Sequence, residues 1–178
     1  VGTLPNGCFD QINEWEPLTK YLESGAKNYP EKLMFKIGNS DGKIIEEYSY
    51  LETNHKSNQV ANGLIDFGIK KGDKVGMYML NCAEFVFSIL GTHKTGGVQV
   101  PINKDEKGER LAYVINYSEM QALVVDLSGL PLIEEIADKL TNLKIIYIVS
   151  GSETIPQNIE GIKVSNFVDL YKFTDQNP

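Results

Sequence analysis

Short apolar segments alternate with longer segments of helical spacing through the middle of this chain. The apolar segments are residues 75–79, 98–100, 123–125 and 145–149. The segments between them, whose apolar residues recur with the period of a helix, are residues 82–94, 107–117 and 130–140. This alternation is typical of βαβ units, whose parallel strands are buried on both faces and are therefore almost entirely apolar. The sequence predicts an α/β fold with a doubly wound, mostly parallel sheet and helices on both faces.

A helix and a β-hairpin are expected before the alternating part. Pro17 suits a first helical turn, and Gly68 suits the end of a long helix. The expected elements are a helix over 17–28, a hairpin that turns at 39–42, a helix over 50–67, and a short strand and a short helix after residue 161. Residues 1–178 are expected to form a single α/β domain, which at this length can bury a substantial core.

The apolar spacing of two helices predicts the side chains that they bury. For the long helix these are Val60, Ala61, Leu64, Ile65 and Phe67. For the helix over 82–94 they are Phe85, Val86, Ile89 and Leu90.

Charge and cysteine content exclude several classes of function. The chain has 17 basic and 24 acidic residues, a net charge of −7, which disfavours nucleic acid and anionic membranes as partners. No apolar run has the length of a transmembrane segment. The two cysteines, Cys8 and Cys82, form neither a metal motif nor a disulfide framework, which favours a cytoplasmic protein. The first residue is Val1, so we expect a start that is processed or cut from something longer.

Gly96 and Gly97 form the pair that most resembles a phosphate-binding loop. Such a loop follows a strand and opens a helix, so that backbone N–H groups and the positive end of the helix dipole face the anion. This pair instead follows an expected helix and precedes an expected strand, so carbonyl oxygens would face a phosphate there. We therefore expect the two glycines to turn the chain into the sheet.

The loops after the expected strands show no catalytic signature. Asn81 is expected to cap the following helix with Glu84, and residues 150–156, "SGSETIP", read as a turn. Both histidines, His55 and His93, lie in expected helices and read as surface or capping side chains. Nucleotide-binding, nucleophile-elbow and zinc-protease motifs are not found. The residues alone thus predict no catalytic group and no metal site in this chain.

Residues 17 to 170 resemble the N-terminal part of adenylate-forming acyl-CoA synthetases, a superfamily that includes peptide-synthetase adenylation domains and beetle luciferases. Several segments match family motifs in order and spacing. They are "YSYLE" (48–52), "ANGLIDFGIKKGDKV" (61–75), "LNCAEF" (80–85, for the family's "PNSPEF"), "GTHKTGGVQVPIN" (91–103, for "GxxKAGAVxVPLN") and "RLAYVINYSEMQALVVD" (110–126). The family's phosphate loop, of the form "TSGTTGxPK", comes later than any segment here.

The resemblance implies a fold, a reaction and a set of partners. The chain would be the N-terminal subdomain of a larger ligase, and this piece alone would be inactive. The whole enzyme would use ATP and Mg²⁺ to convert a carboxylic acid to an acyl-adenylate, and then transfer the acyl group to CoA, as in fatty acid metabolism. In isolation the chain is expected neither to bind these cofactors tightly nor to stay monomeric, because its partner half is missing. Which acid is used cannot be read from these residues.

Two alternatives to an acyl-CoA ligase stay open at this point. One is another adenylate-forming enzyme, such as a peptide-synthetase adenylation domain or a luciferase-like enzyme. The other is a stand-alone α/β binding or interaction module.

Arg110 is the one candidate site residue, and it is also the only arginine. The resemblance implies that it could contact the phosphates at the nucleotide end of CoA, with Lys104 and Lys107 close by. Against this, Glu106 lies four residues earlier, in the order that favours a helical ion pair. The pattern alone favours the ion pair.

Overall fold

The structure is a computed structural model, which describes residues 17–151 and 153–178. The helices are α1 (Leu18–Asn28), α2 (Tyr50–Phe67), α3 (Ala83–Lys94), α4 (Gly108–Tyr117) and α5 (Leu130–Glu134). The strands are β1 (Leu33–Gly38), β2 (Ile44–Ser49), β3 (Lys74–Tyr78), β4 (Val98–Pro101), β5 (Ala122–Asp126), β6 (Ile145–Val149), β7 (Asn158–Ile159) and β8 (Ile162–Asn166). Short 3₁₀ helices are η1 (Leu127–Gly129), η2 (Ala137–Lys139) and η3 (Phe167–Lys172).

The main sheet has six strands in the order β4-β3-β5-β6-β8-β7. All neighbours pair in parallel except β7, which pairs with β8 antiparallel at the edge. The four segments that alternation marks as strands therefore lie in one parallel sheet, as predicted. The chain passes from β3 outward to β4 and then returns across β3 to β5, so the sheet is wound in two directions.

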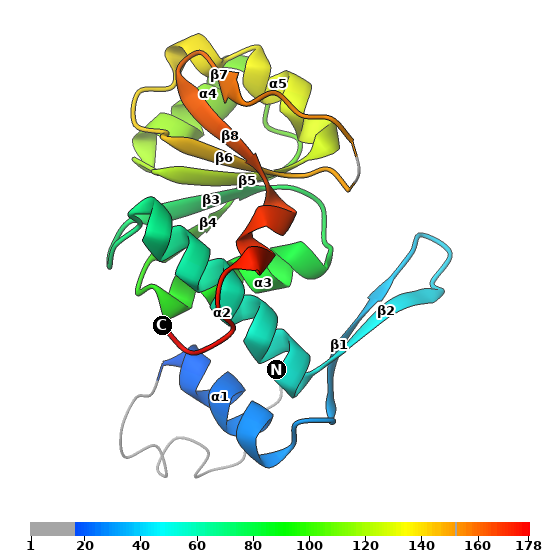
Figure 1. The fold of residues 1–178 in the computed structure, drawn as a ribbon. Helices are drawn as coiled ribbons and strands as arrows, with labels where there is room; N and C mark the ends of the chain where they lie inside the picture. Colours follow the sequence, from blue (N-terminus) through cyan, green and yellow to red (C-terminus); the bar gives the residue numbers. More distant parts are fainter. Residues whose placement is uncertain (1–16, 152) are drawn as a thin grey trace, which may run out of the picture.

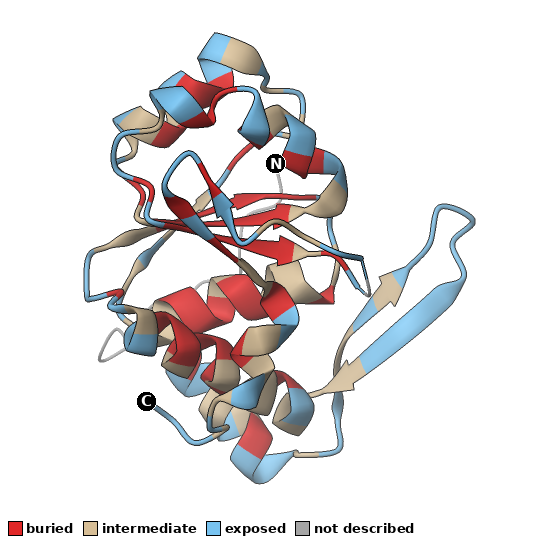
Figure 2. Ribbon diagram, turned by 45° about the horizontal axis from the view of Figure 1, so that its top comes forward, coloured by how far each residue is buried: buried red, intermediate tan, exposed pale blue. Residues whose placement is uncertain are grey.

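Two hydrophobic cores lie on the two faces of the sheet (Figures 1 and 2). On one face α2, α3 and η3 pack against Val75, Met77 and Val124. On the other face α4 and α5 pack against Leu123 and Val125. Because successive side chains of a strand point to opposite faces, each apolar strand supplies both cores. Helices on both faces confirm the doubly wound arrangement.

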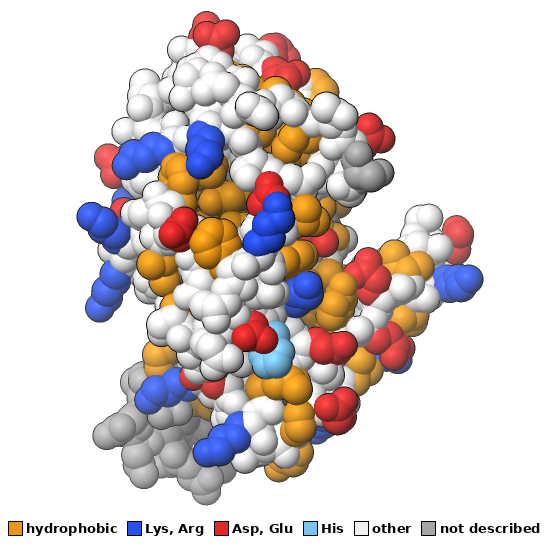
Figure 3. All heavy atoms as spheres, in the orientation of Figure 1, with side chains coloured by type: hydrophobic (Ala, Val, Ile, Leu, Met, Phe, Trp, Pro, Cys, Tyr) orange, Lys and Arg blue, Asp and Glu red, His pale blue; other side chains and the backbone are white. Residues whose placement is uncertain are grey.

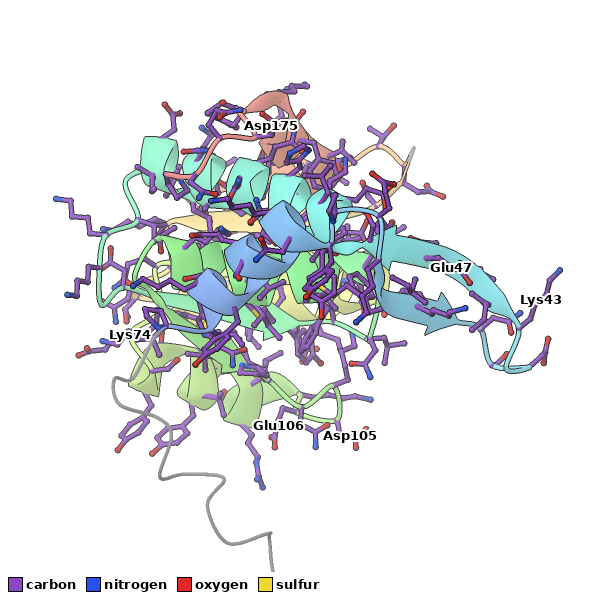
Figure 4. All side chains as sticks on the ribbon, turned by 90° about the horizontal axis from the view of Figure 1, so that it is seen from below. Lys43, Glu47, Lys74, Asp105, Glu106 and Asp175 are labelled. Atoms are coloured by element: carbon purple, nitrogen blue, oxygen red, sulfur yellow. The ribbon has the colours of Figure 1, made fainter. Side chains whose placement is uncertain are left out.

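The hairpin of β1 and β2 extends away from the rest of the molecule (Figure 1). Its strands pair antiparallel, and Lys36 and Glu47 form an exposed ion pair of 2.6 Å across them. Lys43 and Glu47 lie on this projecting part (Figure 4). Only the base is anchored, where Phe35 stacks on Tyr48 with ring centroids 5.0 Å apart.

Helix α2 has a defined start and a defined end. The Ser49 side chain accepts a hydrogen bond from the backbone of Glu52, whose carboxylate accepts one from Ser49 in return, which is a capping box. This bonding lowers the pKa of Glu52. At the other end Gly68 has a φ of 109°, the left-handed conformation that glycine adopts readily.

Amide side chains of α2 hold the last residues of the chain. The Asn58 amide, almost fully buried, donates to the carbonyl of Asp175, and Asn62 donates to the carbonyls of Thr174 and Gln176. Asp175 therefore lies beside α2, far along the sequence but close in space (Figure 4).

Three predictions about helices are wrong in detail. The segment over 130–140 is not one helix, because α5 ends at Glu134 and a separate 3₁₀ turn follows at Ala137–Lys139. Ile65, expected to be buried, is exposed. In α3 the most buried large side chain is Phe87, whereas Phe85, Val86 and Ile89 are only half-buried.

Within the described part of the chain, none of the helices is both long enough and apolar enough to cross a membrane.

Candidate functional site

The carboxyl ends of β3 and β4 border a crevice next to the point where the winding of the sheet reverses, which lies between β3 and β5. From β3 the chain passes through α3 on one face to β4, and from β5 it passes through α5 on the other face in the opposite direction to β6, so the connections diverge between β3 and β5. Open α/β sheets bind ligands at such a point, outside the carboxyl ends of the strands, and the crevice lies at this edge of the sheet. A cavity of about 360 Å³ lies there, with walls formed by residues 79–81, Phe85 and residues 101–104.

Lys104 and Asp126 form the charged centre next to this crevice. Lys104 follows β4 and Asp126 ends β5, and the Lys104 Nζ atom lies 2.8 Å from the Asp126 Oδ1 atom. Both side chains are 20% exposed. The Lys104 ammonium also lies 4.5 Å from the centroid of the Tyr78 ring and donates to the Ser128 hydroxyl at 3.3 Å. Its charge is thus already balanced within the protein.

Asp126 is held in its ionised form by its hydrogen-bond donors. Burial alone would raise the pKa of this carboxyl, but hydrogen bonds from Lys104, Ser128 and the backbone N–H of Leu80 outweigh burial and lower it. The backbone N–H of Gly129 donates to the same carboxylate at 2.9 Å. Asp126 therefore joins the loops that follow β3, β4 and β5.

Tyr78 holds the loop between β4 and α4 in position through hydrogen bonds. Its side chain is fully buried, and its hydroxyl donates to the carbonyls of Lys104 at 3.2 Å and Glu106 at 2.7 Å. Burial raises the pKa of Tyr78, and the nearby carboxylates of Asp126 and Asp105 raise it further. The phenol stays protonated and serves as a hydrogen-bond donor rather than as an acid.

Arg110 lies in the first turn of α4, with its side chain 78% exposed. Its Nε atom lies 2.6 Å from the Glu106 Oε2 atom, which is the ion pair that the four-residue spacing predicts, although Glu106 precedes the helix. Lys104, expected nearby, instead turns toward Asp126. Figure 4 shows Asp105 and Glu106 together in the loop that precedes α4. The structure thus brings Arg110 to an acidic residue and leaves its other guanidinium N–H groups in solvent.

The predicted turn at Gly96 and Gly97 is confirmed. Gly96 has a φ of 73°, and its carbonyl accepts from the backbone N–H of Gly72 at 3.0 Å. The backbone N–H of Gly97 donates to the carbonyl of Thr92 at 3.1 Å, within the last turn of α3. The pair ends α3 and starts β4, so its N–H groups do not face a phosphate.

The expected cap at the start of α3 is wrong. The helix begins at Ala83, after Cys82, and shows no side-chain capping hydrogen bond. Asn81 lies one residue too early to cap it and instead lines the crevice. Burial raises the pKa of the Cys82 thiol to about 12, so this cysteine is a poor nucleophile and a poor metal ligand at neutral pH. Cys8 and Ser152 lie outside the described residues.

The remaining candidates lie on separate elements of the fold. His55 on α2 has its Nδ1 atom 3.6 Å from the Asp175 Oδ2 atom, and His93 lies in the last turn of α3. Ser150 is buried and accepts a hydrogen bond from the Asn166 amide at 2.7 Å, with no helix directly after it. Over residues 17–151 and 153–178, no three His, Cys, Asp or Glu side chains are grouped so that they could hold a metal ion.

Neither the crevice nor the Gly96–Gly97 turn fits Mg-ATP. The basic side chain at the crevice, Lys104, is neutralised by Asp126, and the Gly-Gly turn lies at the wrong end of its helix. What the crevice offers is an apolar wall and the amides of Asn81 and Asn103. Sequence reasoning missed the Lys104–Asp126 pair. The signal available was that the carboxyl ends of parallel strands share one edge, but the order of the strands was not known.

Comparison with known proteins identifies a common family. A family model described as "AMP-binding enzyme" matches residues 22–172. A crotonobetaine/carnitine–CoA ligase of Escherichia coli is 38% identical over 100 residues, which are 56% of this chain and 19% of that protein. The chain therefore spans about a fifth of the length of the curated relatives that it matches.

Solved structures share the fold at lower sequence identity. An anthranilate CoA ligase in complex with anthranoyl-AMP matches 91% of this chain and 28% of its own, with a TM-score of 0.72 and 24% identity. A coronafacic acid ligase from Pectobacterium brasiliense matches 90% of this chain and 30% of its own, with a TM-score of 0.77 and 19% identity. These likenesses show that the α/β arrangement described above occurs within ligases of this kind.

Proposed function

The chain belongs to the AMP-binding enzyme family, and from this membership we propose that it is the N-terminal part of an adenylate-forming acyl-CoA ligase. The match over residues 22–172 carries the proposal, and the 38% identity to a CoA ligase supports the choice within the family. The complete enzyme would join a carboxylic acid to the thiol of CoA with ATP as the energy source.

The proposed reaction has two steps. A carboxylate oxygen of the acid attacks the α-phosphorus of ATP, which forms an acyl-adenylate and releases pyrophosphate. The sulfur of CoA then attacks the acyl carbon, loses its proton, and displaces AMP. Because neither the crevice nor the Gly96–Gly97 turn fits Mg-ATP, we assign no chemical step to this chain. Its contribution is a rigid parallel sheet with a fixed carboxyl edge, in which Asp126 joins three loops.

The proposal is tested with the chain joined to its downstream coding sequence. Such a protein should exchange pyrophosphate into ATP only with its acid present, and should release an acyl-CoA thioester when CoA is added. A panel of acids that includes fatty acids would identify the substrate. Exchange without thioester formation would favour another adenylate-forming enzyme, and no exchange with any acid would contradict the proposal.

The 178-residue chain alone should show neither tight Mg-ATP binding nor pyrophosphate exchange. The physical reason is that Lys104, the basic side chain beside the crevice, already pairs with Asp126 at 2.8 Å. Titration calorimetry with Mg-ATP and an exchange assay with the acid panel measure this directly. Pyrophosphate exchange by the isolated chain would contradict this expectation and would mean that the chain contains an active site.

We also propose that Arg110 contacts the phosphates of CoA in the complete enzyme. Its side chain is 78% exposed, and its Nε atom pairs with Glu106. A charge-assisted hydrogen bond contributes about 1.5–3 kcal/mol, so Arg110→Ala should raise the KM for CoA by roughly tenfold or more and leave adenylate formation unchanged. Glu106→Gln is the matched control, since it removes the competing carboxylate and should not raise this KM. An unchanged KM for CoA in Arg110→Ala would leave only the surface ion pair.

We propose that the protein is cytoplasmic. The isolated chain is further expected to self-associate. Large hydrophobic side chains are exposed on α1 and on the projecting hairpin, among them Leu18, Tyr21, Ile44 and Ile45. Exposed apolar surface of this kind favours association. Sedimentation velocity should show dimers or larger species at micromolar concentration, whereas a monomer at every concentration would favour a stand-alone module.

A further inference from the structure

A second pocket lies on the α2 face of the sheet, toward the amino ends of β6 and β8. We call it the β6–β8 pocket. It has a volume of about 540 Å³, within the usual range for small-ligand sites, and its lining includes Phe67, Ile145, Tyr147, Lys163 and Leu170. It is distinct from the crevice at the carboxyl ends of β3 and β4, and the inference drawn from it does not depend on the proposed ligase activity.

The floor of the β6–β8 pocket is apolar. Ile145 and Leu170 are each about 1% exposed, and Phe67 forms a half-buried wall. Gly63 on α2 lets η3 approach closely, because a Cβ atom there would lie 2.5 Å from the Leu170 Cδ2 atom and 3.0 Å from Phe173. Figure 3 shows hydrophobic side chains gathered on this face, with acidic and basic side chains around them.

Tyr147 brings a hydroxyl to this pocket that has no hydrogen-bond partner among the described residues. The residue is 4% exposed and lines the pocket, yet its hydroxyl makes no hydrogen bond within the described part of the chain. This oxygen is not one of the buried polar atoms that lack a partner in the described part of the chain, so it faces the open pocket while its ring is buried. Burial, and then the charge of Asp66, raise the pKa of Tyr147, so the group remains an O–H donor. It is available to donate to an acceptor atom of a ligand in the pocket.

Lys163 provides a positive charge on the same face of the sheet. Residue pairs Ile145–Lys163 and Tyr147–Ser165 face each other in the parallel register of β6 and β8, so Lys163 and Tyr147 are diagonal neighbours. The Lys163 ammonium lies 5.7 Å from the centroid of the Phe67 ring and forms no ion pair with the described residues. In contrast, Lys172 at the rim is already paired with Asp169 at 2.6 Å.

Asp66 limits the charge that the ligand can carry. This carboxylate lines the pocket from α2, and the Asp169 carboxylate lines it from η3. Lys163 can balance one negative charge, but a second one would meet two carboxylates without a further unpaired cation among the lining residues. The site therefore favours a monoanion over phosphate or a dicarboxylate.

We propose that the β6–β8 pocket binds a small monocarboxylate with an apolar body. The Tyr147 hydroxyl and the Lys163 ammonium bind its carboxylate, and Ile145, Phe67 and Leu170 contact its apolar part. An aromatic or short aliphatic acid has this chemistry and fits the volume of the pocket.

The test uses benzoate as the probe and the ¹⁵N-labelled chain as the receptor. Titration should shift the amide signals of residues 145–147 and 163–165 with saturation in the millimolar range. Benzyl alcohol, which lacks the charge, and phthalate, which doubles it, should each bind at least roughly fivefold more weakly, the size expected when one charge-assisted hydrogen bond is lost or a repulsion is added. Equal shifts with all three probes would overturn the proposal.

Two variants test the roles of the binding groups. Tyr147→Phe removes only the hydroxyl, and Lys163→Gln changes an exposed side chain, so both should fold, as their amide spectra will show. Each should weaken benzoate binding roughly fivefold or more. The control Lys172→Gln, whose charge is already paired, should bind within about twofold of the parent chain. Parent-like binding in both Tyr147→Phe and Lys163→Gln, or no saturable shift with the parent chain, would refute the proposed site.

Discussion

Replacing Phe87 with alanine is expected to lower the free energy of unfolding by about 3–5 kcal/mol. Phe87 is 1% exposed and lies at the centre of an aromatic cluster. The centroid of its ring lies 5.1 Å from that of Tyr48, 6.0 Å from that of Phe35 and 6.4 Å from that of Tyr171. The side chain thus joins α3 to the hairpin base and to η3. Urea unfolding followed by circular dichroism measures the loss.

Tyr113→Ala on α4 is the matched aromatic control. Tyr113 is 63% exposed and stacks on Tyr117 at 5.4 Å, so it contacts solvent and one neighbour rather than three buried elements. Its replacement should cost less than about 1 kcal/mol, as is usual for surface positions. If both variants lost the same free energy of unfolding, the Phe87 cluster would not be a main contact between α3, the hairpin and η3.

The central position of Phe87 shows what helical periodicity cannot supply. Apolar spacing in α3 predicts Phe85, Val86, Ile89 and Leu90 as the buried face. The structure buries Leu90 but centres the buried side on Phe87, because α3 packs against the sheet and also against α2. A helix that packs against two neighbours has no single apolar stripe. Its sequence therefore predicts that a helix forms, but not which of its side chains are most buried.

The segment after β5 shows a second limit. Residues 130–140 have helical spacing, and Ile133, Ile136 and Ala137 are all buried as that spacing suggests. The backbone nevertheless leaves the α-helix after Glu134 and tightens into a 3₁₀ turn. In contrast, the parallel strands were predictable, because a continuous apolar run bounded by helices fits no other position in an α/β fold.

The position of the candidate site could be predicted from the sequence, but the side chains that meet there could not. Alternating strands and helices imply a carboxyl edge where loops gather, and the crevice between β3 and β4 lies there. The pairing of Lys104 with Asp126 depends on β3 lying between β4 and β5, which pattern and propensity do not specify. The Arg110–Glu106 pair, in contrast, was predictable, because the two residues are only four positions apart in the sequence.

Asp126→Ala should be the most damaging change at the carboxyl edge, with a loss of about 3 kcal/mol in the free energy of unfolding. The substitution leaves the Lys104 ammonium without its carboxylate, only 20% exposed, and removes the acceptor of the Leu80 and Gly129 backbone N–H groups. Glu47→Ala is the control, because it breaks an exposed ion pair of 2.6 Å on the hairpin and should cost at most about 1 kcal/mol. Similar losses in the two variants would contradict a structural role for Asp126.

The difference in stability between the parent chain and Asp126→Ala should depend on pH, and this dependence tests whether the charge of Asp126 causes it. The folded structure lowers the pKa of Asp126, through hydrogen bonds that outweigh its burial, below the value of about 3.9 for an unfolded aspartate. The ionised carboxylate therefore stabilises the folded state fully above the unfolded pKa, and this contribution is lost as the pH falls through the folded pKa. The parent chain should exceed Asp126→Ala in stability by a constant amount from about pH 5 upward, and the gap should narrow below about pH 4. A gap of the same size at pH 3 and pH 7 would mean that the side chain stabilises by packing, with no contribution from its charge.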